Sequence, residues 1–173
     1  MLYEYDGRKP TVGRGTYVSE IARVIGDVAI GDNCYIGHGA VLRGDYGSIV
    51  IGDGTAVEEG VIIHAPPNGC CSVGEMVTIG HGAIIHAASV DSHAVIGMGA
   101  ILSIYSEVGG HTIVAEGCVV KMRQIIPGGV VAGGNPARVI REVAQKDIEY
   151  WAMGKELYID LAKKYLEKGM HPL

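Results

Sequence analysis

The chain has 173 residues, which is enough for one domain with a buried core. Its net charge of −5 and the lack of any run of Lys and Arg argue against nucleic acid as a partner, because phosphate binding needs clustered cations. The N-terminus lacks a signal sequence and no apolar run is long enough to span a bilayer, so we expect a cytoplasmic protein without a membrane partner.

Glycine is abundant, with 27 residues, while charged residues make up 19% of the chain. No Gly-X-Y period is present, so this composition predicts many tight turns between short strands and not a collagen-like protein. The four cysteines, at positions 34, 70, 71 and 118, form no C-x-x-C pair. Cys34 and Cys118 fall at small-residue positions of the repeat described next, and we interpret them as core residues.

An aliphatic residue recurs every six positions along most of the chain, and a small residue follows four positions after it. Ile36 with Ala40 and Ile85 with Ser89 are two such pairs. This period fits neither an amphipathic helix nor a half-buried strand, but it fits a solenoid in which three hexads close one triangular coil. The aliphatic residues would point inward and the small residues would fill the corners. The repeat resembles that of left-handed parallel β-helix proteins, and we take the handedness from that resemblance.

The repeat is interrupted at residues 43–50 and 65–78, and it ends near Pro127 in a stretch rich in proline and glycine. We expect a helix that Asp147 caps and that runs to about Glu167. Residues 1–143 are therefore assigned to the β-helix domain with its N-terminal cap, and 144–173 to a C-terminal helix of the same structural unit. An apolar stripe on this helix would pack on the solenoid or on a neighbouring subunit, and consists of Ile148, Trp151, Ala152, Tyr158, Leu161, Ala162 and Tyr165.

Three histidines occupy related places in the repeat. His64 and His86 each directly follow an inward aliphatic residue, and about one coil separates them, so their rings should stack at about one strand spacing, ~4.8 Å. His81 lies on the preceding hexad and points from another face, so a symmetric trimer would be needed to bring it to the other two. Three imidazoles with one open position are typical of catalytic zinc. The alternative is that these are solvated surface histidines, as we expect for His38.

Several motifs, taken in order, resemble the γ-class carbonic anhydrase family, and the resemblance covers nearly the whole chain. The motifs are Leu42-Arg43-Gly44-Asp45, Val57-Glu58-Glu59-Gly60, Ile63-His64, Ile79-Gly80-His81, Ile85-His86 and the later GGNPARVIRE. The segment from Trp151 to Tyr158 resembles the branch found in carnitine-metabolism and phenylacetate-degradation operons.

This resemblance implies a homotrimer with three metal ions at its interfaces. His64 and His86 of one subunit and His81 of its neighbour would hold Zn²⁺, with Fe²⁺ or Co²⁺ as alternatives. A metal-bound hydroxide would attack carbon dioxide and release bicarbonate.

The resemblance also implies roles for the neighbouring charged residues. Arg43, Asp45 and Glu58 would be the catalytic residues beside the metal. Arg43 would form an ion pair with Glu59 across the interface, and Asp45 would join the hydrogen-bond network of the metal-bound water. Glu58 stands where the family usually has Gln, so it would act as a general base, and its charge would change the pKa of the hydroxide.

Three other functions stay open at this point. A metal-dependent acyl-CoA thioesterase would use the same hydroxide on a thioester carbonyl. A hexapeptide acyltransferase would use one histidine as a base and would not need the three-histidine cluster. A non-catalytic scaffold protein would keep the fold without the reaction. Metal analysis separates the acyltransferase from the carbonic anhydrase and the thioesterase, which both need a metal. Substrate assays separate those two enzymes from each other.

Overall fold

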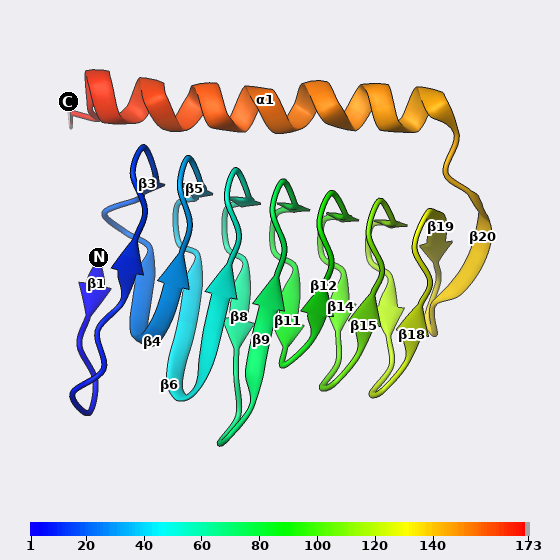
Figure 1. The fold of residues 1–173 in the computed structure, drawn as a ribbon, viewed down its shortest axis with the longest axis horizontal. Coiled ribbons are helices and arrows are strands. Elements are labelled where there is room, and N and C mark those ends of the chain that lie inside the picture. The colour runs from blue at the N-terminus through cyan, green and yellow to red at the C-terminus, as the bar shows by residue number, and fades with distance from the viewer. Residues whose placement is uncertain (172–173) are drawn as a thin grey trace.

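The computed structural model describes residues 1–171, in which short strands wind into a left-handed parallel β-helix of hexapeptide repeats. One long helix, α1 (Gln145–Lys168), returns along the outside of the solenoid from its C-terminal end towards its N-terminal end (Figure 1). The predicted fold class is confirmed.

The first wall of the solenoid is an eight-stranded sheet beneath α1. Its first seven strands lie in consecutive coils and each pairs in parallel with the next, so the backbone donors and acceptors of one coil are satisfied by its neighbours. β20 closes this sheet in antiparallel pairing with β19. The strands are β3 (Tyr17–Val18), β5 (Tyr35–Ile36), β7 (Ala56–Val57), β10 (Thr78–Ile79), β13 (Val95–Ile96), β16 (Ile113–Val114), β19 (Val130–Gly133) and β20 (Arg138–Glu142).

The second and third walls belong to one twelve-stranded sheet that bends around the edge of the prism. The second wall holds β8 (Ile62–His64), β11 (Ile84–His86), β14 (Ile101–Leu102) and β17 (Val119–Val120). The third wall holds β9 (Cys70–Val73), β12 (Ser89–Val90), β15 (Glu107–Val108) and β18 (Ile125–Ile126). At the N-terminal end, β1 (Leu2–Tyr3) and β2 (Thr11–Val12) pair with the first long strand.

Two long strands, β4 (Arg23–Ile30) and β6 (Val41–Ile51), run through the bend and join these two walls. The first interruption of the repeat is therefore the middle of a continuous strand. Close packing at the bend requires glycine, because a Cβ atom on Gly26 would lie 2.5 Å from the carbonyl oxygen of Gly44. The second interruption contains the loop between β8 and β9, followed by β9 itself.

The core of the prism is a column of aliphatic side chains, as the repeat predicts. Ile36, Ile63, Ile85 and Leu102 are fully buried, and the predicted core residues Cys34 and Cys118 are buried as free thiols. One corner residue was predicted wrongly. Ser89 is half-buried, and Ala88 is buried instead. The reason is that Val90 comes five positions after Ile85, one fewer than in a full hexad. The corner therefore falls on the preceding residue, one position closer to the N-terminus.

The C-terminal helix begins earlier than the sequence analysis predicted. Ala144 is the N-cap, and Asp147 lies in the first turn. Its carboxylate accepts a hydrogen bond from the Ala144 backbone N–H at 2.9 Å and pairs with Arg141. Asp147 therefore stabilises the helix start from inside the helix. Within residues 1–171, no helix has the length and hydrophobicity needed to cross a membrane.

Candidate metal centre

His64 and His86 stack on neighbouring strands, as predicted. They are register partners on β8 and β11, and their ring centroids are 5.1 Å apart with 26° between the ring planes. Burial lowers the pKa of His64, and the charge of Arg43 lowers it further, which favours the neutral imidazole that has a free lone pair. His64 Nε2 is buried and has no hydrogen-bond partner among residues 1–171. An orphaned buried nitrogen of this kind fits a metal ligand.

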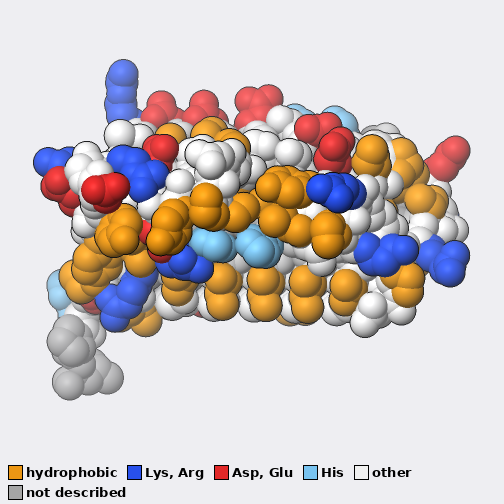
Figure 2. Space-filling model, turned by 90° about the horizontal axis from the view of Figure 1, so that it is seen from below, with side chains coloured by type: hydrophobic (Ala, Val, Ile, Leu, Met, Phe, Trp, Pro, Cys, Tyr) orange, Lys and Arg blue, Asp and Glu red, His pale blue; other side chains and the backbone are white. Residues whose placement is uncertain are grey.

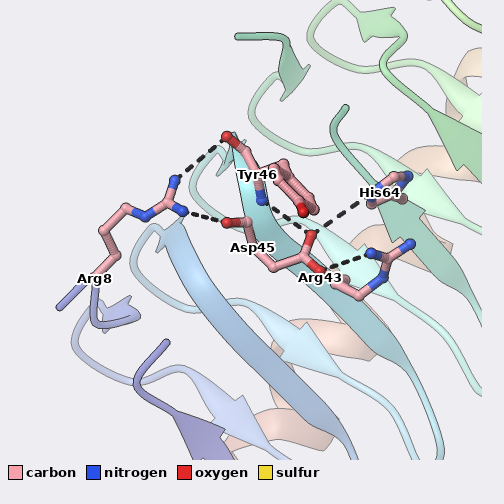
Figure 3. Close-up of polar contacts among 5 residues, drawn as sticks. All are labelled: Arg8, Arg43, Asp45, Tyr46 and His64. Carbon is pink, nitrogen blue, oxygen red and sulfur yellow. Dashed lines mark hydrogen bonds and ion pairs between the residues drawn. The ribbon is translucent and has the colours of Figure 1, made fainter. Parts of the chain in front are cut away.

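Arg43 and Asp45 lie directly beside His64 of this pair (Figure 3). Arg43 is the register partner of His64 on β6, and its guanidinium donates to Asp45 Oδ2 at 2.7 Å. Asp45 Oδ1 lies 3.7 Å from His64 Nε2. Partial burial would raise the pKa of Asp45, but the hydrogen bond and charge of Arg43 outweigh it and lower that pKa below its usual range. Asp45 is therefore an anion that faces the orphaned nitrogen.

Arg8, which the sequence analysis did not single out, fixes the backbone of this segment. Its guanidinium donates to the carbonyl oxygens of Asp45 and Tyr46, as Figure 3 shows. The contact joins the N-terminal cap to the middle of β6. These segments are far apart in the sequence, so no local sequence pattern could have predicted the contact.

His81 lies at the corner after β10, away from the stacked pair, and both of its ring nitrogens face carboxylates. Its Nδ1 is 2.8 Å from Glu59 Oε2, and its Nε2 is 3.1 Å from Glu58 Oε2. Glu58 is 5% exposed and also accepts the His81 backbone N–H at 3.1 Å. A ring that donates its Nδ1 proton to Glu59 would leave Nε2 as the nitrogen able to coordinate a metal, and such carboxylate support is usual for histidine ligands.

Two tyrosines hold these carboxylates from the side of α1. Tyr35 donates its hydroxyl hydrogen to Glu59 Oε1 at 2.7 Å. The pKa of Tyr158, on α1, is raised by burial and by its hydrogen bond with Glu58. The repeat marks Tyr35 as the outward residue before an inward Ile36, but its partner could not be predicted without the position of the helix. The expected ion pair between Arg43 and Glu59 of adjacent subunits stays a prediction, since within one chain each has the other partners described here.

The remaining histidines have other surroundings. His38, expected to play no part in the site, contacts Ser19 Oγ at 2.7 Å and the Tyr165 hydroxyl at 3.2 Å, and so connects the solenoid with α1. Within residues 1–171 of one chain, no group of three or more His, Cys, Asp or Glu residues could hold a metal ion. One chain therefore brings together His64 and His86 but not His81.

The second wall, which carries the stacked pair, is also lined by exposed aliphatic side chains. Ile62, Ile84 and Ile101 follow one another in register on β8, β11 and β14 and are 43%, 38% and 37% exposed. Figure 2, which views the solenoid from the side opposite α1, shows hydrophobic side chains in a regular row beside histidines. An apolar row of this kind is typical of a surface that another protein chain covers.

Comparisons with known proteins connect this chain to one family. A family model described as bacterial transferase hexapeptide, of six repeats, matches residues 9–44. Gamma carbonic anhydrase 2 from the mitochondria of Arabidopsis thaliana is 38% identical over 90% of this chain, and the match spans 58% of that longer protein. A carbonic anhydrase from Geobacillus kaustophilus is 32% identical over 99% of this chain and 90% of its own length.

Two further proteins extend the comparison. The carnitine operon protein CaiE of Salmonella agona is 34% identical over 92% of this chain and 81% of its own length. Among solved structures, a hexapeptide transferase family protein from Anaplasma phagocytophilum superposes with a TM-score of 0.91 at 34% identity and covers 95% of this chain and 97% of that one.

Proposed function

Because the chain belongs to the γ-class carbonic anhydrase family, which includes the carnitine-operon branch, we propose that it is a metal-dependent enzyme that hydrates carbon dioxide reversibly. The observation that carries the proposal is the orphaned, buried Nε2 of His64, stacked beside His86 and facing the Asp45 carboxylate. The ligand residues fit Zn²⁺, and imidazole also suits Fe²⁺ and Co²⁺.

We further propose that the active form is a homotrimer. His64 and His86 on the second wall of one chain would meet His81 from the corner of its neighbour, and the exposed row of Ile62, Ile84 and Ile101 would be buried in the same contact. A repeated contact between two different surfaces closes into a ring when the rotation between neighbours closes, as a threefold rotation does.

Each charged residue then has a distinct task. The bound ion would act as a Lewis acid that lowers the pKa of a water molecule towards neutrality. Glu59 fixes the orientation of His81, and Tyr35 fixes Glu59. Glu58 Oε2, beside the coordinating nitrogen of His81, is the acceptor that we assign for the proton of the attacking water. Asp45, kept ionised by Arg43, would orient the same water from the side of His64.

The direct test is a stopped-flow assay of carbon dioxide hydration on protein loaded with Zn²⁺, and separately with Fe²⁺ and Co²⁺. The matched variants are His86→Ala, in the stacked pair, and His38→Ala, which lies outside it. The proposal predicts hydration above the buffer rate for the wild type and for His38→Ala, and no such rate for His86→Ala. A metal-replete wild type with no rate above buffer would reject the reaction.

A second candidate reaction is hydrolysis of acyl-CoA thioesters at the same metal centre, favoured by the similarity to the carnitine operon protein along most of both chains. Release of free thiol from short-chain acyl-CoA substrates, measured on the same metal-loaded protein, separates the two. Thiol release without carbon dioxide hydration would select the thioesterase and leave the metal centre in place.

A further inference from the structure

A cavity of about 580 Å³ lies between α1 and the solenoid, and its lining differs from the residues of the candidate metal centre. Its volume falls within the range of small-molecule sites. Most of the lining is apolar, and histidines enter from one corner of the solenoid. The residues that matter here are Trp151 from α1, Val95 and Ile113 from the first wall, and Met76, His93 and His111 from the corner.

One charged side chain of the cavity, Lys155 of α1, is buried and has no counter-ion among residues 1–171. It is 4% exposed, and its ammonium contacts the carbonyl oxygen of Ala94 at 3.4 Å, near the outer limit of a hydrogen bond. That oxygen already accepts the Thr78 backbone N–H at 3.1 Å. Burial lowers the pKa of Lys155 to about 8. An ammonium has three donors, so this group lacks acceptors in an apolar setting.

The histidines occupy backbone positions that favour glycine. At the corner between the third and first walls, successive coils place one residue at positive φ, and this row consists of Gly15, Asn33, Gly54, Met76, His93, His111 and Gly129. Glycine adopts this conformation at no steric cost, whereas a larger side chain is strained there. Met76, His93 and His111 are the members of the row that line the cavity. Their side chains therefore line the cavity from backbone positions at which the turn itself would favour glycine.

The two imidazoles and the lysine form one basic group. The rings of His93 and His111 stack at 4.7 Å with 10° between their planes. Burial lowers the pKa of His93, and the charges of His111 and Lys155 lower it further, while Glu75 raises it. The charges of His111 and Lys155 thus disfavour a proton on His93, and an anion placed among the three side chains would offset that effect.

The acidic residues of the cavity do not neutralise this group. Asp147 is paired with Arg141 and accepts the Ala144 N–H. Glu156 and Asp160 are exposed residues of α1. The buried end of the cavity is therefore basic, and its walls are apolar.

We propose that this cavity binds a carboxylic acid with an apolar body, as its anion, with the carboxylate on Lys155, His93 and His111 and the body against Trp151 and Ile113. The site does not depend on the proposed reaction, and its ligand would also hold α1 against the solenoid.

Calorimetric titration of the full chain with octanoate tests the proposal, with 1-octanol as the uncharged probe of equal length. We expect one octanoate per chain and binding of octanol weaker by about tenfold or more, since a charge-assisted contact is lost. Lys155→Met should weaken octanoate by a similar factor, whereas Lys163→Met, an exposed lysine of the same helix, should not. His111→Gly should weaken octanoate without lowering stability, because glycine suits its backbone conformation.

Three results would overturn the proposal. Wild-type protein that does not bind octanoate excludes the site. Equal binding of octanol and octanoate reduces it to an apolar groove. Unchanged affinity in both Lys155→Met and His111→Gly shows that the basic group does not hold the carboxylate. None of these outcomes bears on carbon dioxide hydration, so this proposal and the proposed reaction can fail separately.

Discussion

Replacing the buried Lys155 with Met should make the protein more stable. The pKa of Lys155 falls from about 10.5 to about 8 on burial, and each pH unit corresponds to about 1.4 kcal/mol, so burying the ammonium costs the folded state roughly 3 kcal/mol at neutral pH. Met keeps most of the stem, and the Ala94 carbonyl oxygen keeps its bond from Thr78. We therefore expect Lys155→Met to raise the free energy of unfolding by about 2 kcal/mol at pH 7.

The same reasoning fixes the pH dependence. The folded-state pKa of Lys155 is below its unfolded value, so from about pH 8 to about pH 10.5 the unfolded chain binds more protons, and wild-type stability rises with pH. Lys155→Met lacks this rise, so its advantage should shrink from pH 7 to pH 9.5. Urea unfolding followed by the fluorescence of Trp151, the one tryptophan of the chain, measures both effects, with Lys163→Met as the control. A variant less stable than wild type at pH 7, or an advantage that does not change with pH, would refute the reasoning.

Three further predictions concern the candidate metal centre and its interface. Glu59→Gln weakens the acceptor of the His81 Nδ1 proton, so metal affinity in a chelator competition should fall by about 10- to 100-fold, and an unchanged affinity would contradict the assigned role. Ile84→Glu places a charge in the apolar row, so sedimentation should show monomers, while Leu166→Glu on α1 should sediment as wild type; trimers of Ile84→Glu would place the interface elsewhere. Glu58→Ala should keep its metal and lose most carbon dioxide hydration, and full activity would remove Glu58 from proton transfer.

The repeat was sufficient to predict the solenoid and the stacked histidines. A period of six fixes which side chains point inward, and residues at equivalent places of successive coils become register partners, as His64 and His86 do. The same counting misplaced the corner at Ser89, because a hexad that is one residue short looks regular until the strands are paired. Periodicity thus predicts the path of the chain well where every coil has the same length.

Contacts between α1 and the solenoid could not be predicted from the sequence. The apolar stripe indicated which side of the helix is buried, but not its rotation or its position along the first wall. The hydrogen bond between Tyr158 and Glu58 depends on both. Lys155 lies on the buried side of the helix, although a charged residue in an apolar stripe is ordinarily predicted to be exposed. Similarly, the support of His81 by Glu59 and Tyr35 joins three coils and follows from their stacking.

Subunit complementation tests most directly the claim that neighbouring chains share each metal site. Homotrimers of His81→Ala, and separately of His86→Ala, should bind no metal at this site. The two variants are then mixed in equal amounts, unfolded and refolded together. A complete site needs a chain with intact His86 next to a chain with intact His81, and each condition holds for about half of the chains. About a quarter of the wild-type metal should therefore be recovered. Elemental analysis of the mixed trimers gives the answer. Recovery near a quarter supports the shared site, and a mixture that stays metal-free, or either variant binding a full complement alone, would contradict it.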